Sequence, residues 1–153
     1  MNVHYRAADF TVDGALRDVV VLDARLEDWQ RVLASLAATG WQVDFDPRKP
    51  GCSLDISVIE ANSLLSRGED DYSPILAVAV GDIWFTCYFF DVGEIEFSFD
   101  PADVSGSDDF AALCEFVEWL GDVCGKRVVV TMESSDHASI PPLIEYLPSV
   151  TGV

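Results

Sequence analysis

Three apolar runs near the middle of the chain follow one another almost without interruption, and they constrain the fold more than any other segment. They are ILAVAVG (75–81), DIWFTCYFFD (82–91) and EIEFSFD (94–100). Their β-branched and aromatic residues are typical of strands, and one or two turn residues separate each run from the next. Connections this short join antiparallel neighbours. The sequence therefore predicts an antiparallel meander at the centre of a sheet.

Two segments with helical periodicity lie on either side of the meander, at residues 25–40 and 105–125. Gly40 is the predicted C′ residue of the first segment, directly after its C-cap. In the second, Ser107 is the predicted N-cap and Gly125 the predicted end. The inner stripes comprise Leu26, Trp29, Leu33 and Leu36 in the first segment, and Phe110, Leu113, Val117, Leu120 and Cys124 in the second.

The remaining segments complete one sheet. Residues 15–24, 41–47 and 126–134 are predicted strands. Residues 53–65 fit a strand in their first half and a short helix in their second, and residues 139–147 predict a short helix or turn.

The resulting order is strand, helix, strand, meander, helix, strand. It predicts an α+β fold: a single mostly antiparallel sheet with a central meander and two main helices packed on it. The pattern leaves open whether the helices cover one face or both. At 153 residues without a long linker, the chain is expected to form a single α+β domain spanning 1–153.

Charge narrows the classes of partner. The chain has 27 acidic and 9 basic residues, for a formal net charge of −18. Such an excess repels nucleic acid and anionic membranes, and it favours rapid encounter with a basic protein surface. Only two of the basic residues are Lys, and Asp outnumbers Glu two to one, as in salt-adapted proteins. The charge thus indicates either a basic partner or an adaptation to salt.

Other global features indicate a cytoplasmic protein. No apolar run approaches the roughly 18 residues of a membrane helix, and the first residues lack the apolar core of a secretory signal. The cysteines have no metal-site spacing, and we expect reduced thiols within a core. They are Cys52, Cys87, Cys114 and Cys124.

Acidic and apolar residues alternate in the third run of the meander. Glu94, Glu96 and Asp100 point to one side of a strand, while Ile95 and its alternate neighbours face the core. A two-residue turn at positions 92–93 sets the expected hairpin register. It pairs Asp91 with Glu94, Phe89 with Glu96, Cys87 with Ser98 and Phe85 with Asp100, and it buries Tyr88 and Phe90.

Three interpretations of this mixed face stay open: a partly solvated sheet face, a protein-binding surface and a paired-carboxylate catalytic site. Aromatic anchors inside a charged rim are typical of protein interfaces. Catalytic carboxylates need environments that separate their pKa values, for which alternation gives no evidence. We therefore expect a recognition surface. Its predicted members are Glu94, Glu96, Asp100, Phe85, Phe89 and Asp91, with a second acidic segment at Glu69, Asp70 and Asp71.

Motifs for other chemistry are absent. The sequence has no GxSxG, P-loop or GxGxxG pattern, so it predicts neither an enzyme nor a metal or other cofactor. Glu133, Asp136 and His137 lack HExxH or HxH spacing and are expected in a surface loop. Residues 100–109 lack the order of a calcium loop and fit a helix cap.

Three segments carry a family resemblance: LRDVVVLDARLEDWQRVLASL (16–36), GDIWFTCYFFDVGEIEFSFDP (81–101) and FVEWLGDVCGKRVVVTMES (116–134). Together they cover under half of the chain. In these segments the chain resembles the small acidic immunity proteins of bacterial polymorphic-toxin and contact-dependent inhibition systems.

The resemblance implies a stoichiometric cytoplasmic inhibitor. It would bind a cognate toxin domain, often a basic nuclease, and block its active site or an essential surface. The residues also allow a general acidic adaptor module or nucleic-acid mimic, and a small carboxylate-dependent hydrolase.

Overall fold

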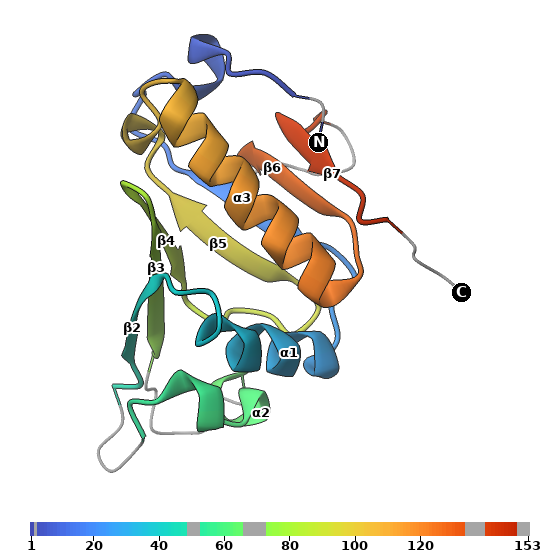
Figure 1. Cartoon of the computed structure of the whole chain (residues 1–153). Coiled ribbons are helices and arrows are strands. Elements are labelled where there is room, and N and C mark those ends of the chain that lie inside the picture. The colour runs from blue at the N-terminus through green and yellow to red at the C-terminus, as the bar shows by residue number, and fades with distance from the viewer. Residues whose placement is uncertain (2, 49–52, 66–72, 134–139, 150–153) are drawn as a thin grey trace.

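In the computed structural model, seven strands form one antiparallel sheet in the order β2-β3-β4-β5-β1-β6-β7 (Figure 1). The structure describes residues 1, 3–48, 53–65, 73–133 and 140–149. The strands are β1 (Arg17–Val21), β2 (Gln42–Asp46), β3 (Ile75–Val80), β4 (Ile83–Cys87), β5 (Ile95–Phe99), β6 (Val128–Met132) and β7 (Ile144–Tyr146). The predicted α+β fold and its central meander β3-β4-β5 are confirmed.

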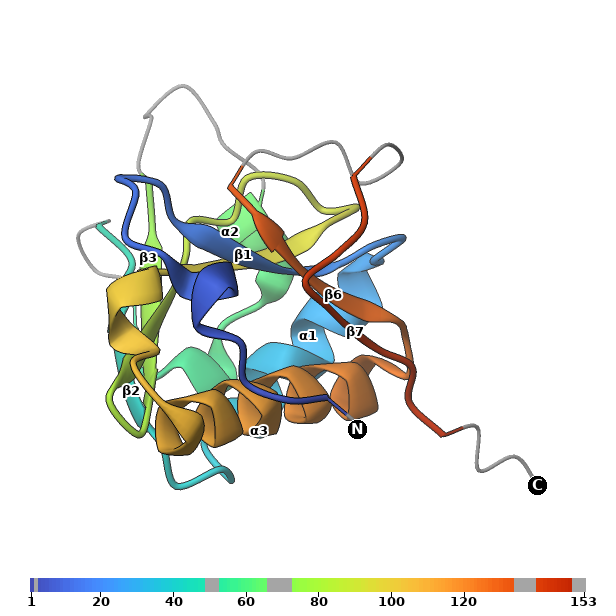
Figure 2. The same cartoon turned by 90° about the horizontal axis from the view of Figure 1, so that it is seen from above.

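Two main helices cover the sheet from the same side. Helix α3 (Ser107–Cys124) lies across β5, β1 and β6, and α1 (Leu26–Leu36) packs beside its C-terminal half (Figures 1 and 2). The short α2 (Ala61–Leu65) contacts α1. Within the described ranges no helix combines the length and apolarity needed to cross a membrane.

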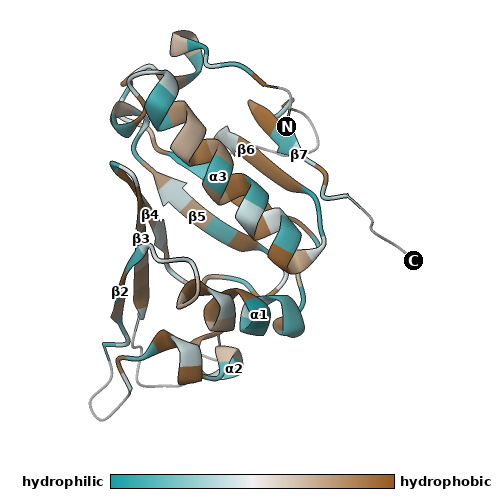
Figure 3. Cartoon of the chain, in the orientation of Figure 1, coloured by the Kyte–Doolittle hydropathy of each residue, from teal (hydrophilic) through white to brown (hydrophobic). Residues whose placement is uncertain are grey.

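Aromatic packing joins α3 to the sheet. The ring of Phe116 stacks on Phe85 at 4.0 Å between centroids and meets Phe97 edge-on at 5.1 Å. The predicted inner stripe of α3 is buried, as its periodicity required. Figure 3 shows the result as hydrophobic strands and a helix α3 with alternating hydrophobic and hydrophilic segments. Gly125 ends α3 in the left-handed region, at φ 63°.

The opposite face of the sheet carries a row of polar side chains. Thr86, Ser98, Asp18 and Thr131 are cross-strand neighbours on β4, β5, β1 and β6. We call these four residues the polar row. Asp18 and Thr131 are buried, and the Thr131 hydroxyl makes no hydrogen bond to another described residue. All five residues of β1, which lies between β5 and β6, are buried.

Two of the predicted elements were wrong. The segment expected as a helix or turn contains β7, which extends the sheet beyond β6 and begins where the Leu143 N–H donates to the Val130 carbonyl oxygen at 2.7 Å. The first half of residues 53–65 forms a 3₁₀ turn at Ile56–Val58 instead of a strand, because the Asp55 carboxylate accepts from the Ser57 N–H.

Helix boundaries also differ from the prediction. Helix α1 ends at Leu36, so Gly40 lies beyond it at φ 78°. Helix α3 begins at Ser107 with Gly106 as N-cap. The Asp109 carboxylate, in the first turn, accepts from both the backbone N–H and the hydroxyl of Ser105. Asp109 therefore fixes the residue that precedes the N-cap, and Ser107 is the first residue of the helix instead of its predicted N-cap.

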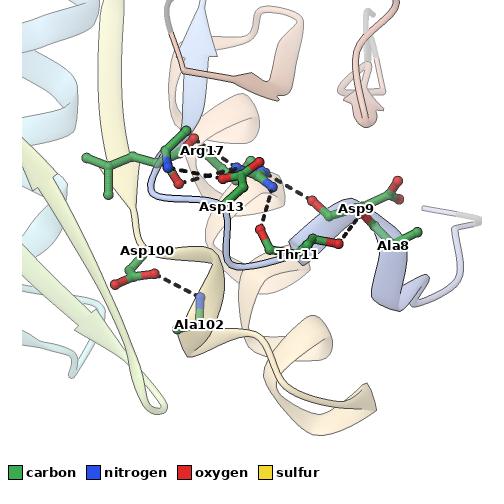
Figure 4. A network of polar contacts seen from close by, with 9 residues as sticks. Ala8, Asp9, Thr11, Asp13, Arg17, Asp100 and Ala102 are labelled. Atoms are coloured by element: carbon green, nitrogen blue, oxygen red, sulfur yellow. Dashed lines mark hydrogen bonds and ion pairs between the residues drawn. The ribbon is translucent and has the colours of Figure 1, made fainter.

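A buried arginine fastens the N-terminal segment to the start of β1 (Figure 4). Arg17 is 1% exposed, and its guanidinium donates to the carbonyl oxygens of Asp9 and Thr11, both at 3.0 Å. It also donates to the carbonyl oxygens of Ala15 and Leu16 and lies 3.5 Å from the Asp13 carboxylate. The hydrogen bonds offset the desolvation of a buried cation.

Replacing Arg17 should loosen this segment. We expect Arg17→Met to lower the free energy of unfolding by about 2–4 kcal/mol, because part-buried carbonyl oxygens lose their donor. Urea denaturation measures the change. The control is Arg6→Met, since Arg6 is an exposed residue that pairs with Asp9 at 3.5 Å and should change stability by less than about 0.5 kcal/mol. Equal effects of the two substitutions would contradict the role assigned to Arg17.

Candidate functional site

The candidate site is the hairpin that joins β4 to β5. Val92 and Gly93 form its turn, and Asp91 and Glu94 pair across it, as the sequence predicted. The Asp91 carboxylate accepts from the Gly93 N–H at 2.9 Å and stabilises the turn.

Below the turn, the register differs from the prediction by one residue. Thr86 pairs with Ser98, where Cys87 was expected. Four residues of the first strand, 87–90, therefore oppose three of the second, 95–97. One extra residue in one strand is a β-bulge. Phe89, within the bulge, has a φ of 57°, which is uncommon for a residue other than glycine.

The shifted register corrects the predicted surface. Phe85 and Phe89 are buried in the core, so neither lies on an exposed face with the carboxylates. Their places outside are taken by Tyr88 and Phe90, which were expected to be buried and are 39% and 72% exposed. The two exposed rings stack, with centroids 5.6 Å apart and an interplanar angle of 20°.

Helix α1 holds this hairpin in position. The Trp29 indole N–H donates to the Val92 carbonyl oxygen at 2.9 Å, and its ring packs on Phe89 at 5.5 Å. The Ala24 N–H donates to the Gly93 carbonyl oxygen at 2.9 Å. Burial of Phe89 against Trp29 offsets the strain of its left-handed backbone, which is on the order of 1 kcal/mol.

The carboxylates and exposed rings line one small pocket of about 80 Å³. Its walls are Trp29, Thr86, Tyr88, Phe89, Phe90, Asp91, Glu94, Glu96 and Ser98. We call Tyr88, Phe90, Asp91, Glu94 and Glu96 the hairpin surface. The structure thus brings together three of the predicted acidic residues, Asp91, Glu94 and Glu96, with aromatic neighbours that the sequence analysis had placed elsewhere.

The base of the pocket connects to the buried polar row. The Ser98 hydroxyl donates to the Asp18 carboxylate at 2.9 Å, and Asp18 is only 4% exposed. A hydroxyl has a single hydrogen, so the Ser98 oxygen can act toward the pocket only as an acceptor.

Asp100, which was also predicted to belong to the recognition surface, lies at the other end of β5, away from the pocket. Its carboxylate accepts from the Ala102 N–H at 2.9 Å and begins the 3₁₀ turn Pro101–Asp103. Burial, together with the negative charges of Asp100, Asp109 and Asp82, raises the pKa of Asp103. We call these four aspartates the distal cluster. Its members lie in the turns and the helix start beyond the ends of β3 and β5, apart from the hairpin pocket.

A second group of charges is structural. The Asp28 carboxylate, 2% exposed, accepts from Lys126 Nζ at 2.5 Å and from the Arg25 N–H at 2.9 Å, and it pairs with Arg31. Burial would raise the pKa of Asp28, but these hydrogen bonds and positive charges outweigh it and leave the pKa below its usual value. Lys126 also donates to the Asp23 carbonyl oxygen, so it joins the start of α1 to the turn between α3 and β6.

Thiols and possible metal ligands offer no second site in the described ranges. Cys87, Cys114 and Cys124 are free thiols, and burial raises the pKa of Cys87 to about 12. The described residues contain no group of three or more His, Cys, Asp or Glu side chains placed to hold a metal ion. Cys52, the acidic segment Glu69–Asp71 and the pair Asp136 and His137 lie outside the described residues.

Strand β3 carried a signal that could have identified the exposed aromatic pair. Its larger side chains fall on Leu76, Val78 and Val80, with alanines between. A two-residue turn at positions 81–82 pairs these three with Cys87, Phe85 and Ile83. The core face of β4 therefore carries the odd-numbered residues, and Tyr88 and Phe90 point outward.

Comparison of the chain with protein-family models, with curated proteins and with solved structures found no match.

The burial of Asp103, together with repulsion within the distal cluster, gives a test by pH. Because the pKa of Asp103 is higher in the folded chain, ionising it costs folding free energy, and this cost grows as the pH rises through its titration. We expect Asp103→Asn to raise stability near neutral pH by about 0.5 kcal/mol. The gain should vanish in acid, at about pH 3 and below, where the carboxyl is protonated.

Thermal unfolding at several pH values measures this effect. The control is Asp44→Asn, which removes an exposed carboxylate from β2 and should leave stability unchanged at both ends of the range. A gain for Asp103→Asn that persists unchanged in acid would contradict the electrostatic explanation.

Proposed function

We propose that this chain is a stoichiometric protein inhibitor of the immunity type. It binds and neutralises a cognate toxin domain that presents a basic surface, such as a nuclease, and it acts in the cytoplasm without catalytic activity of its own. The observation that carries the proposal is the hairpin surface, where a stacked and exposed Tyr88–Phe90 pair lies among three carboxylates.

The hairpin surface combines the two properties that such an inhibitor needs. Large aromatic side chains supply most of the affinity in protein interfaces, and a polar rim around them excludes water. Phe90, 72% exposed, is the anchor that a partner would cover. Ordered neighbours keep the entropy cost of binding low, since Trp29 and Phe89 fix the hairpin before a partner arrives.

Net charge supports the choice of a basic partner. A toxin that acts on nucleic acid must present Lys and Arg to the phosphate backbone, and an acidic protein can occupy the same surface. With a net charge of −18, the chain would attract such a partner over a distance and accelerate association. Rapid association matters when a few free toxin molecules are lethal.

Co-expression tests the proposal directly. The chain is produced together with the C-terminal domain of the protein encoded immediately upstream, and cell survival and co-purification are scored. Rescue from toxicity with a tight 1:1 complex would support immunity. Absence of both toxicity and a complex would contradict it, and a complex without toxicity would favour a general adaptor module.

Charge reversal on the hairpin surface should slow association with the toxin domain. We expect Glu94→Lys combined with Glu96→Lys to lower the association rate constant about tenfold or more and to weaken its dependence on salt. The matched control reverses two exposed glutamates elsewhere, Glu60 and Glu115, which changes net charge equally. Stopped-flow kinetics measures both variants. Equal slowing in the two would show that net charge matters and that the hairpin does not.

Removal of the aromatic anchor should act on dissociation. Because the Phe90 side chain is largely exposed, Phe90→Ala should leave folding intact. We expect it to raise the dissociation rate constant about tenfold or more, by the roughly 2 kcal/mol typical of a buried anchor. Surface plasmon resonance measures the rate, with Val58→Ala as a control at another exposed apolar side chain. An unchanged dissociation rate would remove Phe90 from the interface.

A further inference from the structure

We propose that the outer face of strands β2, β3 and β4, around Trp84, is a second contact surface that receives a lysine- or arginine-bearing segment of the partner. This inference rests on the proposed function, because it extends the interface with the same basic protein. A stable complex buries about 800 Å² on each partner, which is more than the few side chains of the hairpin surface supply.

The register of the sheet brings the members of this surface together. Trp84 on β4 pairs with Ala79 on β3, and Ala79 pairs with Gln42 on the edge strand β2. In the next row, Ala77 pairs with Asp44 on β2. Residues that pair directly across antiparallel strands point to the same side of the sheet, and here that side is opposite to the buried residues of β3 and β4. We call these five residues the Trp84 face.

Strand β3 has the composition of a strand that is covered on both faces. All six of its residues, ILAVAV, are apolar, a pattern typical of strands buried on both sides. Its inner residues are buried, but Ala77 and Ala79 stay partly exposed. Ala79, the neighbour of Trp84 on β3, presents only a methyl group, and Trp84 is 38% exposed. The apolar part of the Trp84 face can therefore be reached by a partner.

The charges around the Trp84 face have a single sign. Strands β2, β3 and β4 contain no Lys, Arg or His, and Arg48, just beyond β2, pairs with Asp46 at 3.6 Å. Asp44 is exposed and has no ion pair with another described residue. The Asp103 carboxylate lies 3.4 Å from the Trp84 backbone nitrogen. A cation bound here would relieve the repulsion of Asp103 within the distal cluster.

These charges select among the possible occupants. Nucleic acid and anionic membranes would be repelled, and so would a second copy of a chain whose net charge is −18. A cationic side chain suits the surface, because indole is the aromatic ring that attracts cations best and carboxylates flank it. The aliphatic part of Lys or Arg packs on apolar surface such as Ala77 and Ala79. Gln42 and Thr86 can donate as well as accept hydrogen bonds, so the selection rests on the charges and the ring.

The Trp84 face and the hairpin surface lie on the same side of one strand. Trp84, Thr86 and Tyr88 alternate with the buried residues Phe85 and Cys87. The four steps of extended chain from Trp84 to Tyr88 span about 13 Å. One partner of ordinary interface size would therefore cover both surfaces, with Trp84 as a second aromatic anchor.

The test uses the full chain and a defined probe, hexa-arginine amide, followed by chemical shifts of the backbone amides and of the indole N–H groups. We expect saturable shifts of the Trp84 indole and of residues 42–46 and 77–86. Added NaCl should weaken the binding, because the attraction is between exposed charges. Hexa-glutamate amide should produce no shifts there.

Variants locate the binding site. Trp84→Thr keeps a residue that favours strands but removes the ring, and it should weaken binding about threefold, whereas Trp84→Phe should keep most of the affinity. Asp44→Asn should weaken binding about threefold as well. Since Asp44→Asn is expected to leave stability unchanged, its effect on binding cannot come from unfolding. Glu115→Gln removes the same charge from α3, on the other side of the sheet, and should change affinity little.

Several results would overturn the proposal. Shifts confined to the hairpin surface, shifts spread evenly over the chain, or an unchanged affinity in either Trp84→Thr or Asp44→Asn would each do so. Dimerisation of the free chain that Trp84→Thr abolishes would also do so, because the Trp84 face would then bind a second copy.

The outcome is separable from that of the immunity proposal. Rescue by co-expression with no peptide binding at Trp84 would retain the inhibitor and reject the Trp84 face as part of its interface. Peptide binding at Trp84 without rescue would retain the face as a site for basic segments and reject the toxin as the partner.

Discussion

Strand β1 is buried on both faces and paired along both edges, and the packing of the N-terminal segment and of β5 depends on it. Such a strand can carry polar side chains only where partners are provided. Arg17 has carbonyl oxygens of the N-terminal segment around its guanidinium, and Asp18 has the Ser98 hydroxyl. The first arrangement holds the N-terminal segment against the start of β1. In the second, the buried Asp18 binds Ser98, which lines the hairpin pocket.

Contacts on its inner side hold the hairpin in position. On its inner side, Phe89 occupies the core against Trp29, and the indole N–H of Trp29 binds the turn. Its outer side is thereby left to Tyr88, Phe90 and the carboxylates. Contacts of Phe89 and Trp29 in the core thus fix the position of an exposed surface that contributes little to folding. This division of labour is common where binding residues lie on loops held by a rigid scaffold.

The sequence predicted the elements of this fold better than their register. Alternation in the meander and the 3.6-residue stripe of α3 reflect burial directly, so both could be read without a structure. The bulge could not, because Phe89 takes a left-handed conformation that its residue type does not announce. In addition, the run from Trp84 to Phe90 is apolar on both faces, so alternation alone does not say which rings are buried. β7 escaped prediction because its three residues pair only through contact with β6.

Local pattern placed some residues of the candidate site correctly and not others, for the same reasons. Asp91, Glu94 and Glu96 were placed together because the turn at positions 92–93 fixes their pairing locally. Asp100 shares their side of the strand, but the five residues of β5 separate it from Glu94, and it serves as the cap of a 3₁₀ turn. Because of one inserted residue, Tyr88 and Phe90 are exposed where Phe85 and Phe89 had been predicted to be.

That bulge also affects how this surface can change in evolution. It separates the register at the tip of the hairpin from the register of the sheet below, so a gain or loss of one residue between positions 87 and 94 need not disturb β3, β4 and β5. Such a change would rotate a different set of side chains outward in a single step. A lineage facing a rapidly varying partner could thus alter its specificity by small changes in length while the core beneath stays the same.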